Sequence, residues 1–258
     1  KYYQYKQTAA YSAQFGDAFL SSNLNDKVTL TDVYAEANAK YQNKTLGELK
    51  FKIGYNAFNY GYNKLVSLDG VNITNRLKGN VISVGGGYKN KIGKLSLQGD
   101  FGINIAGDFD GNFLEGFARY SLNDSTHVLA SLNINSKAPN YNTLLYQSDY
   151  INYNWQNSFD NINTKQLGVQ FKSKQLVDLA LDYTTINNYT YFEKTDTNNN
   201  LLKPNQASDA VNYVRLKISK EFRYGKFALN NTVRYQKVLD GEGVINVPEI
   251  VTRNTLYY

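Results

Sequence analysis

The stretch Leu95-Ser96-Leu97-Gln98-Gly99-Asp100-Phe101-Gly102-Ile103-Asn104-Ile105 alternates apolar and polar side chains along most of its length. Leucine, phenylalanine and isoleucine share one parity, while serine, glutamine, aspartate and asparagine share the other. A repeat of two residues is that of a β-strand with two chemically different faces. Because a half-buried soluble sheet alternates in the same way, strand length, strand number and the connections must decide between the classes.

The same alternation recurs along the whole chain. Read together with the turn residues, it predicts twelve strands, near residues 2–8, 30–41, 49–60, 80–88, 94–105, 113–121, 127–136, 164–172, 177–191, 211–222, 227–236 and 250–258. Most of them approach the length of about 9 to 11 residues that a tilted strand needs to cross a bilayer. An ordinary globular strand has only about 5 or 6 residues, so strand length favours a membrane-spanning sheet.

The connections between these strands are predicted to alternate between short and long. The short ones fall near residues 42–48, 89–93, 122–126, 172–176 and 223–226, and the long ones near 61–79, 106–112, 137–163, 192–210 and 237–249. Antiparallel strands that turn on two chemically different sides produce this alternation, with short periplasmic turns and long external loops.

These features predict an all-β fold, a transmembrane antiparallel up-and-down β-barrel of at least twelve strands. A membrane sheet must close on itself, because hydrocarbon cannot satisfy an open strand edge. We expect residues 1–258 to form a single outer-membrane barrel domain. The chain starts at Lys1 and stops at Tyr258 within a strand pattern, so we expect this barrel to be incomplete at both ends.

Composition narrows the class of protein further. Mean hydropathy is −0.51, and no apolar run approaches the length of about 20 residues that a membrane helix requires, which excludes a helical membrane protein. The chain has no cysteine, and thus neither disulfides nor thiolate metal sites. Its net charge is +6, but lysine and arginine are dispersed over the polar parity of strands, so we expect no nucleic-acid partner.

Charge separates by parity within the predicted strands. The residues expected to face lipid, such as Ile53, Leu167 and Val169, are all uncharged. The opposite parity is expected to line a hydrated lumen, where charges cost little. The candidate lumen-lining residues are Glu36, Lys50, Lys52, Asp100, Glu115, Arg119, Asp178, Asp182, Arg215, Lys217 and Arg234.

Two stretches carry a family resemblance. The first lies in residues 137–155, where a Pro-Asn-aromatic opening precedes the elements Tyr-Gln-Ser-Asp-Tyr and Tyr-Asn-Trp. The second begins with Tyr-Tyr-Gln-Tyr at residues 2–5 and continues with Phe-Gly-Asp-Ala-Phe at residues 15–19. The chain resembles the "putative porin" family of Bacteroidota outer membranes. The resemblance implies a bacterial outer-membrane β-barrel, without defined catalytic residues and without a known substrate.

The aromatic loop within the first stretch is the most distinctive candidate for a functional element. It can fold inward as a constriction or form a docking surface outside, and the plain alternative is an interfacial aromatic belt combined with loop packing. The candidate constriction or docking residues are Tyr141, Tyr146, Asp149, Tyr150, Tyr153 and Trp155.

Motifs that would carry enzyme chemistry are weak in this chain. The run Gly85-Gly86-Gly87 lacks the Lys-Ser/Thr pair and the following helix of a phosphate loop. The better interpretation is that these glycines keep the barrel wall free of side chains or leave room for a neighbouring tyrosine. Residues 108–112 resemble part of a calcium loop but lack its final glutamate, which favours a hairpin turn. We therefore predict no enzyme, no cofactor and no metal site.

The sequence predicts a channel for passive diffusion of ions or small hydrophilic solutes. The alternative is a structural or accessory barrel that serves as a subunit of an envelope transport or secretion complex. A third reading is a piece of an energy-coupled receptor. The expected partners are outer-membrane lipids, the permeating solutes and envelope proteins, and the expected location is the bacterial outer membrane.

Overall fold

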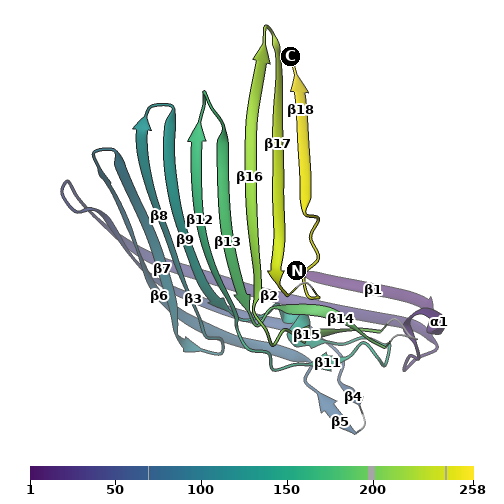
Figure 1. Cartoon of the computed structure of the whole chain (residues 1–258). Helices are drawn as coiled ribbons and strands as arrows, with labels where there is room; N and C mark the ends of the chain where they lie inside the picture. Colours follow the sequence, from purple (N-terminus) through teal and green to yellow (C-terminus); the bar gives the residue numbers. More distant parts are fainter. Residues whose placement is uncertain (69, 197–200, 242) are drawn as a thin grey trace.

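A single antiparallel sheet organises the chain in a computed structural model that describes residues 1–68, 70–196, 201–241 and 243–258. Neighbouring strands in the sheet are also consecutive sheet strands along the chain (Figure 1). The twelve strands are β1 (Tyr2–Ala9), β2 (Ser22–Asn43), β3 (Gly47–Tyr62), β6 (Arg76–Ile92), β7 (Leu95–Gly107), β8 (Gly111–Asn123), β9 (Thr126–Lys137), β12 (Ile162–Ser173), β13 (Asp178–Asn187), β16 (Val211–Tyr224), β17 (Phe227–Asp240) and β18 (Ile250–Tyr257). The predicted up-and-down order is confirmed.

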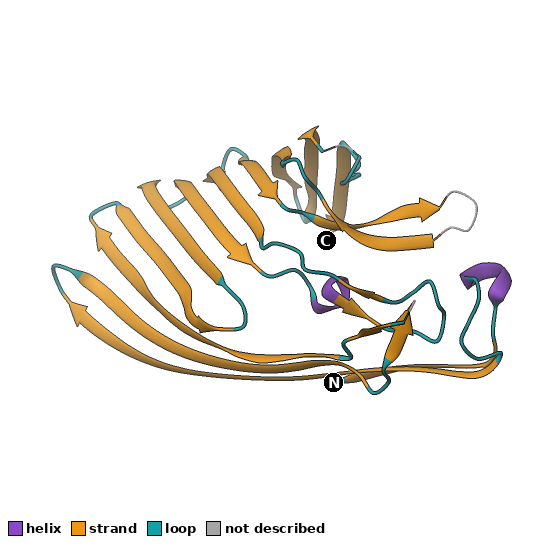
Figure 2. Ribbon diagram, turned by 90° about the horizontal axis from the view of Figure 1, so that it is seen from below, coloured by secondary structure: helices purple, strands orange, loops and turns teal. Residues whose placement is uncertain are grey.

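The sheet is strongly curved and encloses a concave face. Its strands fan out from the flat-lying β2 and β3 to the upright β16, β17 and β18, and the curved wall is seen most directly from below (Figures 1 and 2). The right-handed twist between neighbouring strands accumulates over twelve strands into this shape. Within the described residues, β1 and β18 form the two edges of the sheet.

All twelve predicted strands are present, but several run further than predicted. Strand β2 has 22 residues and begins at Ser22, and β6 continues to Ile92, so its hairpin turns at Gly93, at the end of the predicted connection 89–93. The predicted strand 177–191 is wrong at its end. Strand β13 stops at Asn187, because Asn188 adopts a positive φ of 57° and breaks the extended backbone.

Most of the long connections contain structure of their own and gather at one end of the sheet, called here the long-loop end; the opposite end is the short-turn end (Figure 1). The extra elements are α1 (Ser12–Phe15), the hairpin of β4 (Val66–Leu68) and β5 (Val71–Ile73), α2 (Tyr141–Leu144), the pair β10 (Leu145–Tyr146) and β11 (Trp155–Gln156), and the hairpin of β14 (Thr190–Asp196) and β15 (Leu201–Gln206). No helix in the described residues is long and apolar enough to cross a membrane.

One predicted long connection is wrong. Strand β7 ends at Gly107 and β8 starts at Gly111, so residues 108–110 form a tight turn. The backbone N–H of Asn80 donates a 2.8 Å hydrogen bond to the Asp108 carboxylate and holds the turn against β6. The hairpin interpretation of residues 108–112 is therefore confirmed, while the strict alternation of short and long connections fails at this position.

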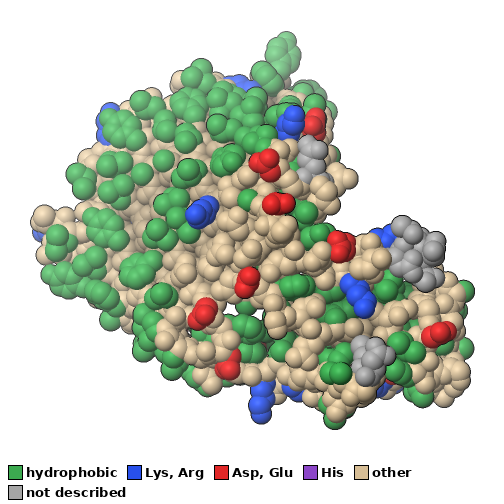
Figure 3. Space-filling view, turned by 60° about the horizontal axis from the view of Figure 1, so that its bottom comes forward, with side chains coloured by type: hydrophobic (Ala, Val, Ile, Leu, Met, Phe, Trp, Pro, Cys, Tyr) green, Lys and Arg blue, Asp and Glu red, His purple; other side chains and the backbone are tan. Residues whose placement is uncertain are grey.

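The convex face of the sheet is apolar and exposed. Cross-strand registry places Ile53 opposite Val84 and Val84 opposite Ile103, and Leu167 opposite Leu132. Leu167 is 61% exposed. Figure 3 shows hydrophobic side chains spread over a broad area with few charges, whereas charged side chains gather mainly toward the connections. A continuous apolar surface of this kind is unfavourable in water and favourable against acyl chains.

The glycine run lies inside strand β6 and not in a phosphate-binding turn. A Cβ atom on Gly86 would lie 2.9 Å from the Phe101 ring, and one on Gly87 would lie 3.0 Å from the Asp100 carboxylate. The run therefore leaves room for the Phe101 ring on the convex face and for the Asp100 carboxylate on the concave face. The neighbouring ring is a phenylalanine, not the tyrosine that the sequence predicts.

Candidate functional site

The concave face carries the polar parity of the strands. Registry places Lys52 opposite Gly85, and Asp100 opposite Glu115. Each of the eleven candidate lumen-lining residues has a parity opposite to that of the apolar convex residues on its own strand. The structure thus gathers these side chains on one face, although they come from seven different strands.

Six of these eleven residues form three separate ion pairs. Lys50 Nζ lies 3.8 Å from Glu36 Oε1, and Lys52 pairs with Asp100. Arg215 binds one oxygen of Asp182 twice, through Nε at 3.0 Å and Nη2 at 2.8 Å. These pairs bridge neighbouring or next-nearest strands, so they hold charged groups of both signs in fixed positions on the wall.

The other five residues have no ion pair among the described residues. Glu115 and Arg119 lie on β8, Lys217 on β16 and Arg234 on β17, where Lys217 and Arg234 are direct cross-strand neighbours of like charge. Asp178 instead caps a short turn, since its carboxylate accepts a 3.1 Å hydrogen bond from the backbone N–H of Ser173. The eleven residues therefore form a lining and not a single compact site.

A cavity of about 640 Å³ lies against the concave face of the β2–β9 region. Glu36, Lys52 and Glu115 supply charges of both signs, and Asn56 and Asn133 supply amide groups. Polar groups of mixed character around an open volume can solvate ions and small hydrophilic molecules. In the described residues, no group of three or more His, Cys, Asp or Glu side chains is placed to hold a metal ion.

The long loop (residues 138–161) folds back onto the concave face at the long-loop end, and α2 lies in the hollow of the sheet (Figure 2). Tyr60 and Tyr62 of β3 project from that face and form a buried cluster with Leu145 of the loop. Tyr141 stacks on Tyr60 with 5.2 Å between ring centroids. The aromatic side chains of the loop therefore pack inside the curved wall.

The remaining aromatic residues of the long loop tie its parts together. Tyr146 stacks on Trp155 at 4.7 Å, and Trp155 Nε1 donates a 2.9 Å hydrogen bond to the carbonyl of Asn142. Tyr150 contacts the Phe15 ring of the β1–β2 connection at 5.1 Å. Tyr153 meets the same Phe15 ring edge-on at 6.0 Å. Burial raises the pKa of the Tyr146 phenol above its ordinary value.

Four residues fix the long loop to the wall, and we call them the loop anchor: Asp26, Lys64, Ser148 and Asp149. The Asp26 carboxylate accepts hydrogen bonds from Ser148 Oγ at 2.5 Å and from the backbone N–H of Asp149 at 2.7 Å. The Asp149 carboxylate accepts a 2.7 Å hydrogen bond from the backbone N–H of Asn25. Lys64 pairs with Asp149 and lies 3.8 Å from Asp26.

Sequence reasoning singled out only Asp149 from the loop anchor. Asp26 lies in the part of β2 that was not predicted as strand, and Lys64 lies in a segment that was predicted only as a loop. The one signal available in the sequence was the charge of these residues at positions that flank the long strands. Contacts between residues 26, 64 and 149 depend on the folding of the loop, which alternation does not encode.

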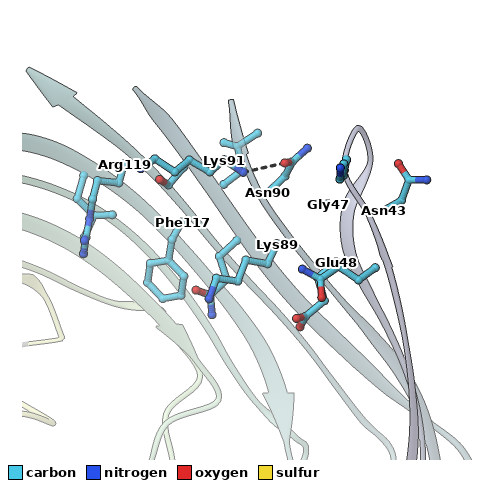
Figure 4. Close-up of a pocket in the computed structure, with 14 residues that line it drawn as sticks. Asn43, Gly47, Glu48, Lys89, Asn90, Lys91, Phe117 and Arg119 are labelled. Carbon is cyan, nitrogen blue, oxygen red and sulfur yellow. Dashed lines mark hydrogen bonds between the residues drawn. The ribbon is translucent and has the colours of Figure 1, made fainter. Parts of the chain in front are cut away.

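A second and larger cavity, of about 840 Å³, lies at the short-turn end of the concave face (Figure 4). It is lined by Lys44, Glu48, Lys89, Lys91, Phe117 and Arg119, together with polar residues of the β2–β3 and β6–β7 hairpins. Of these residues, only Arg119 was predicted from the sequence as lumen-lining. The strand ends β3 and β6 ran beyond their predicted limits, which is why the lysines of β6 were overlooked.

Comparison with known proteins gives one family match and several structural matches. The family described as "Putative porin" matches residues 1–258. Among curated protein sequences, none matches this chain. The match covers the whole of the given sequence.

The solved structures that resemble this chain share its fold at low identity. The siderophore receptor PirA from Acinetobacter baumannii matches with a TM-score of 0.64 and 11% identity, over 92% of this chain and 41% of that one. A ferric enterobactin receptor (PfeA) variant from Pseudomonas aeruginosa in complex with enterobactin gives 0.64 and 11%, over 91% and 40%. The FrpB iron transporter from Neisseria meningitidis gives 0.58 and 10%, over 85% and 38%. The chain thus spans less than half the length of these proteins.

Proposed function

The chain belongs to the putative porin family, and from that premise we propose that it is a channel for passive diffusion of ions or small hydrophilic solutes. As a member of this family, the protein is a β-barrel protein of the bacterial outer membrane and not an enzyme. We further propose that residues 1–258 act as one barrel domain, and that the source is a member of the Bacteroidota, because residues 2–19 and 137–155 resemble family members from that group.

One observation carries this proposal. A cavity of about 640 Å³ on the concave face is bordered by carboxylates, ammonium groups and amides, whereas the convex face of the same strands is apolar. A wall that is wetted on one side and apolar on the other is the arrangement that lets polar solutes pass through hydrocarbon. The ion pairs Lys52–Asp100 and Arg215–Asp182 fix the lining charges and create a field across the polar side.

The long loop supports a constriction more than a docking surface. Tyr150 is 4% exposed and Trp155 is 8% exposed, so their rings have little surface to offer an external partner. The loop packs on the concave face and is held there by the loop anchor. We propose that it narrows the path at the long-loop end and sets the size limit for solutes.

Planar-bilayer recording of the full chain tests the channel. We expect stepwise, nearly ohmic conductance, and a larger step when residues 140–157 are replaced by a short Gly-Ser linker that removes most of the long loop. Retention of β-structure by circular dichroism controls for misfolding of the shortened variant. Silent bilayers from folded, membrane-inserted protein would overturn the proposal.

An accessory role in an envelope complex is the second candidate. It is favoured by the exposed aromatic side chains at the start of the chain, where Tyr2, Tyr3 and Tyr11 are 67%, 71% and 61% exposed. Tyrosine is enriched in protein–protein interfaces. A stable stoichiometric partner that co-purifies in mild detergent, combined with absent conductance, would favour this function over the channel.

A further inference from the structure

The cavity at the short-turn end has an unusual balance of charge. Lys44, Lys89, Lys91 and Arg119 line it, and Glu48 is the one acidic residue among the residues that line it (Figure 4). We call this cavity the basic hollow. The 640 Å³ cavity on the β2–β9 region is lined by charges of both signs in comparable number, whereas the lining of the basic hollow has an excess of cations.

The four cations of the basic hollow are unpaired within the described part of the chain. Glu48 lies directly opposite Lys89 in the strand register, but its carboxylate oxygen Oε1 lies 3.7 Å from Lys40 Nζ and forms its ion pair there. Elsewhere on the concave face, Lys50, Lys52 and Arg215 each pair with a carboxylate, whereas the neighbours Lys217 and Arg234 have no ion pair among the described residues. A set of cations that the protein itself leaves uncompensated attracts anions from solution.

Strand registry arranges these cations around neutral hydrogen-bond donors. Lys91 of β6 lies opposite Ser96 of β7, and Ser96 lies opposite Arg119 of β8. The cationic side chains therefore stand two strands apart, at about 10 Å between backbones, with a hydroxyl group between them. In the adjacent row, Gln98 lies between Lys89 and Phe117, which adds an amide and an apolar ring.

We propose that the basic hollow binds small solutes that carry carboxylate or phosphate groups. Lysine and arginine side chains from β6 and β8 would contact the anionic oxygens, Ser96 and Gln98 would donate hydrogen bonds, and the Phe117 ring would cover the uncharged part of the solute. Because the cations are solvated, binding is weak and falls as salt rises. Any effect of this site on which solutes permeate rests on the proposed channel function, whereas anion binding by the site does not.

Calorimetric titration of the purified full chain in a neutral detergent tests this site. Citrate and inorganic phosphate serve as separate probes, one for carboxylates and one for phosphates, at low and at high salt. We expect one or both to bind at low salt. The double variant Lys89→Gln/Arg119→Gln is expected to lose about tenfold or more in affinity for the anion that binds.

A matched control removes two positive charges elsewhere. Lys165 and Lys237 are exposed and share the parity of the convex face, opposite Ile134 and Val214. The double variant Lys165→Gln/Lys237→Gln is expected to retain anion affinity within about twofold, because its net charge changes equally but the hollow is intact. Equal loss in both double variants would overturn the site and leave only an effect of net charge.

Further outcomes separate this inference from the channel. No binding of either anion, or binding only of an acidic peptide such as polyglutamate, would overturn the small-solute site. If the protein conducts and the Lys89→Gln/Arg119→Gln variant shows the same reversal potential in a salt gradient and the same anion affinity, the inference fails while the channel stands. If the anion binds as predicted but bilayers stay silent, the site stands and the channel fails.

Discussion

At the scale of single residues, the loop anchor is the feature that most needs compensating interactions, because it buries a carboxylate. Asp149 is 4% exposed and negatively charged, and Asp26 lies close enough to share Lys64 with it. A buried carboxylate is stable only when charge and hydrogen bonds compensate its loss of water. Lys64 supplies the charge, while the backbone N–H groups of Asn25 and Asp149 supply hydrogen bonds.

Removing Lys64 should release the long loop. In Lys64→Gln, two neighbouring carboxylates lose their shared cation, and we expect the anchoring of residues 138–161 to weaken by about 1–3 kcal/mol. Limited proteolysis should then cut the long loop faster than in the parent protein, and the conductance step should grow. Lys194→Gln, which removes an exposed lysine from β14, is the control and should leave both readouts unchanged. An uncut loop in Lys64→Gln would show that the anchor has no role.

At the scale of elements, close packing of backbone on the concave face limits which residues β6 accepts. A Cβ atom on Gly85 would overlap the carbonyl oxygen of Phe101 in β7, whereas a Cβ atom on Gly116 of β8 would meet open space. Both glycines lie inside strands, so they differ mainly in what surrounds them.

Gly85→Ala should therefore destabilise the sheet, and Gly116→Ala should not. We expect a cost of about 1–3 kcal/mol for Gly85→Ala, because β6 and β7 must separate slightly to admit the methyl group. Gly116→Ala should stay within about 0.5 kcal/mol of the parent protein. Urea unfolding from detergent or lipid, followed by gel shift of the folded form, measures both. Equal stability of the two variants would contradict the strand register described here.

The elements were predictable where alternation specifies them. The polar and apolar parities of residues 95–105 and 164–172 directly define β7 and β12. The end of β13 was not predictable, because Asn188 interrupts a run that continues to alternate beyond it. In the sequence, Asp149 lies 85 residues from Lys64 and 123 residues from Asp26, so no local pattern could connect them.

At the scale of the whole molecule, the two faces of one curved sheet meet different surroundings. On β12, Val169 is 56% exposed on the convex face and Gln170 lies on the concave face beside it. Registry preserves this separation across the strands, since Val169 lies opposite Ala130 and Leu181. The concave cavities and the apolar convex face both follow from this separation of polar and apolar side chains.

A positive charge should cost far more on the convex face than on the concave one. For Val169→Lys we expect a loss of about 2–4 kcal/mol in folding stability within the bilayer, since the ammonium group enters hydrocarbon. For Gln170→Lys, one residue away, we expect a change below about 1 kcal/mol, because the new charge remains hydrated. Unfolding in lipid vesicles measures both, and similar costs for the two variants would argue against an asymmetric wall.

Spin labelling along β12 tests the central claim most directly, and the absence of native cysteine makes each labelled site unique. Single cysteines are placed in turn at positions 165 to 167 and 169 to 171, and the full chain is reconstituted in lipid vesicles. Gly168 is left unchanged, because a Cβ atom there would lie 2.5 Å from Ser131 Oγ. Accessibility to oxygen, which concentrates in hydrocarbon, should peak at Leu167, Val169 and Phe171, whereas accessibility to a water-soluble nickel chelate should peak at Gln166 and Gln170. Equal accessibility of neighbouring positions to either reagent would contradict the account of a wall with one face in lipid and the other in water.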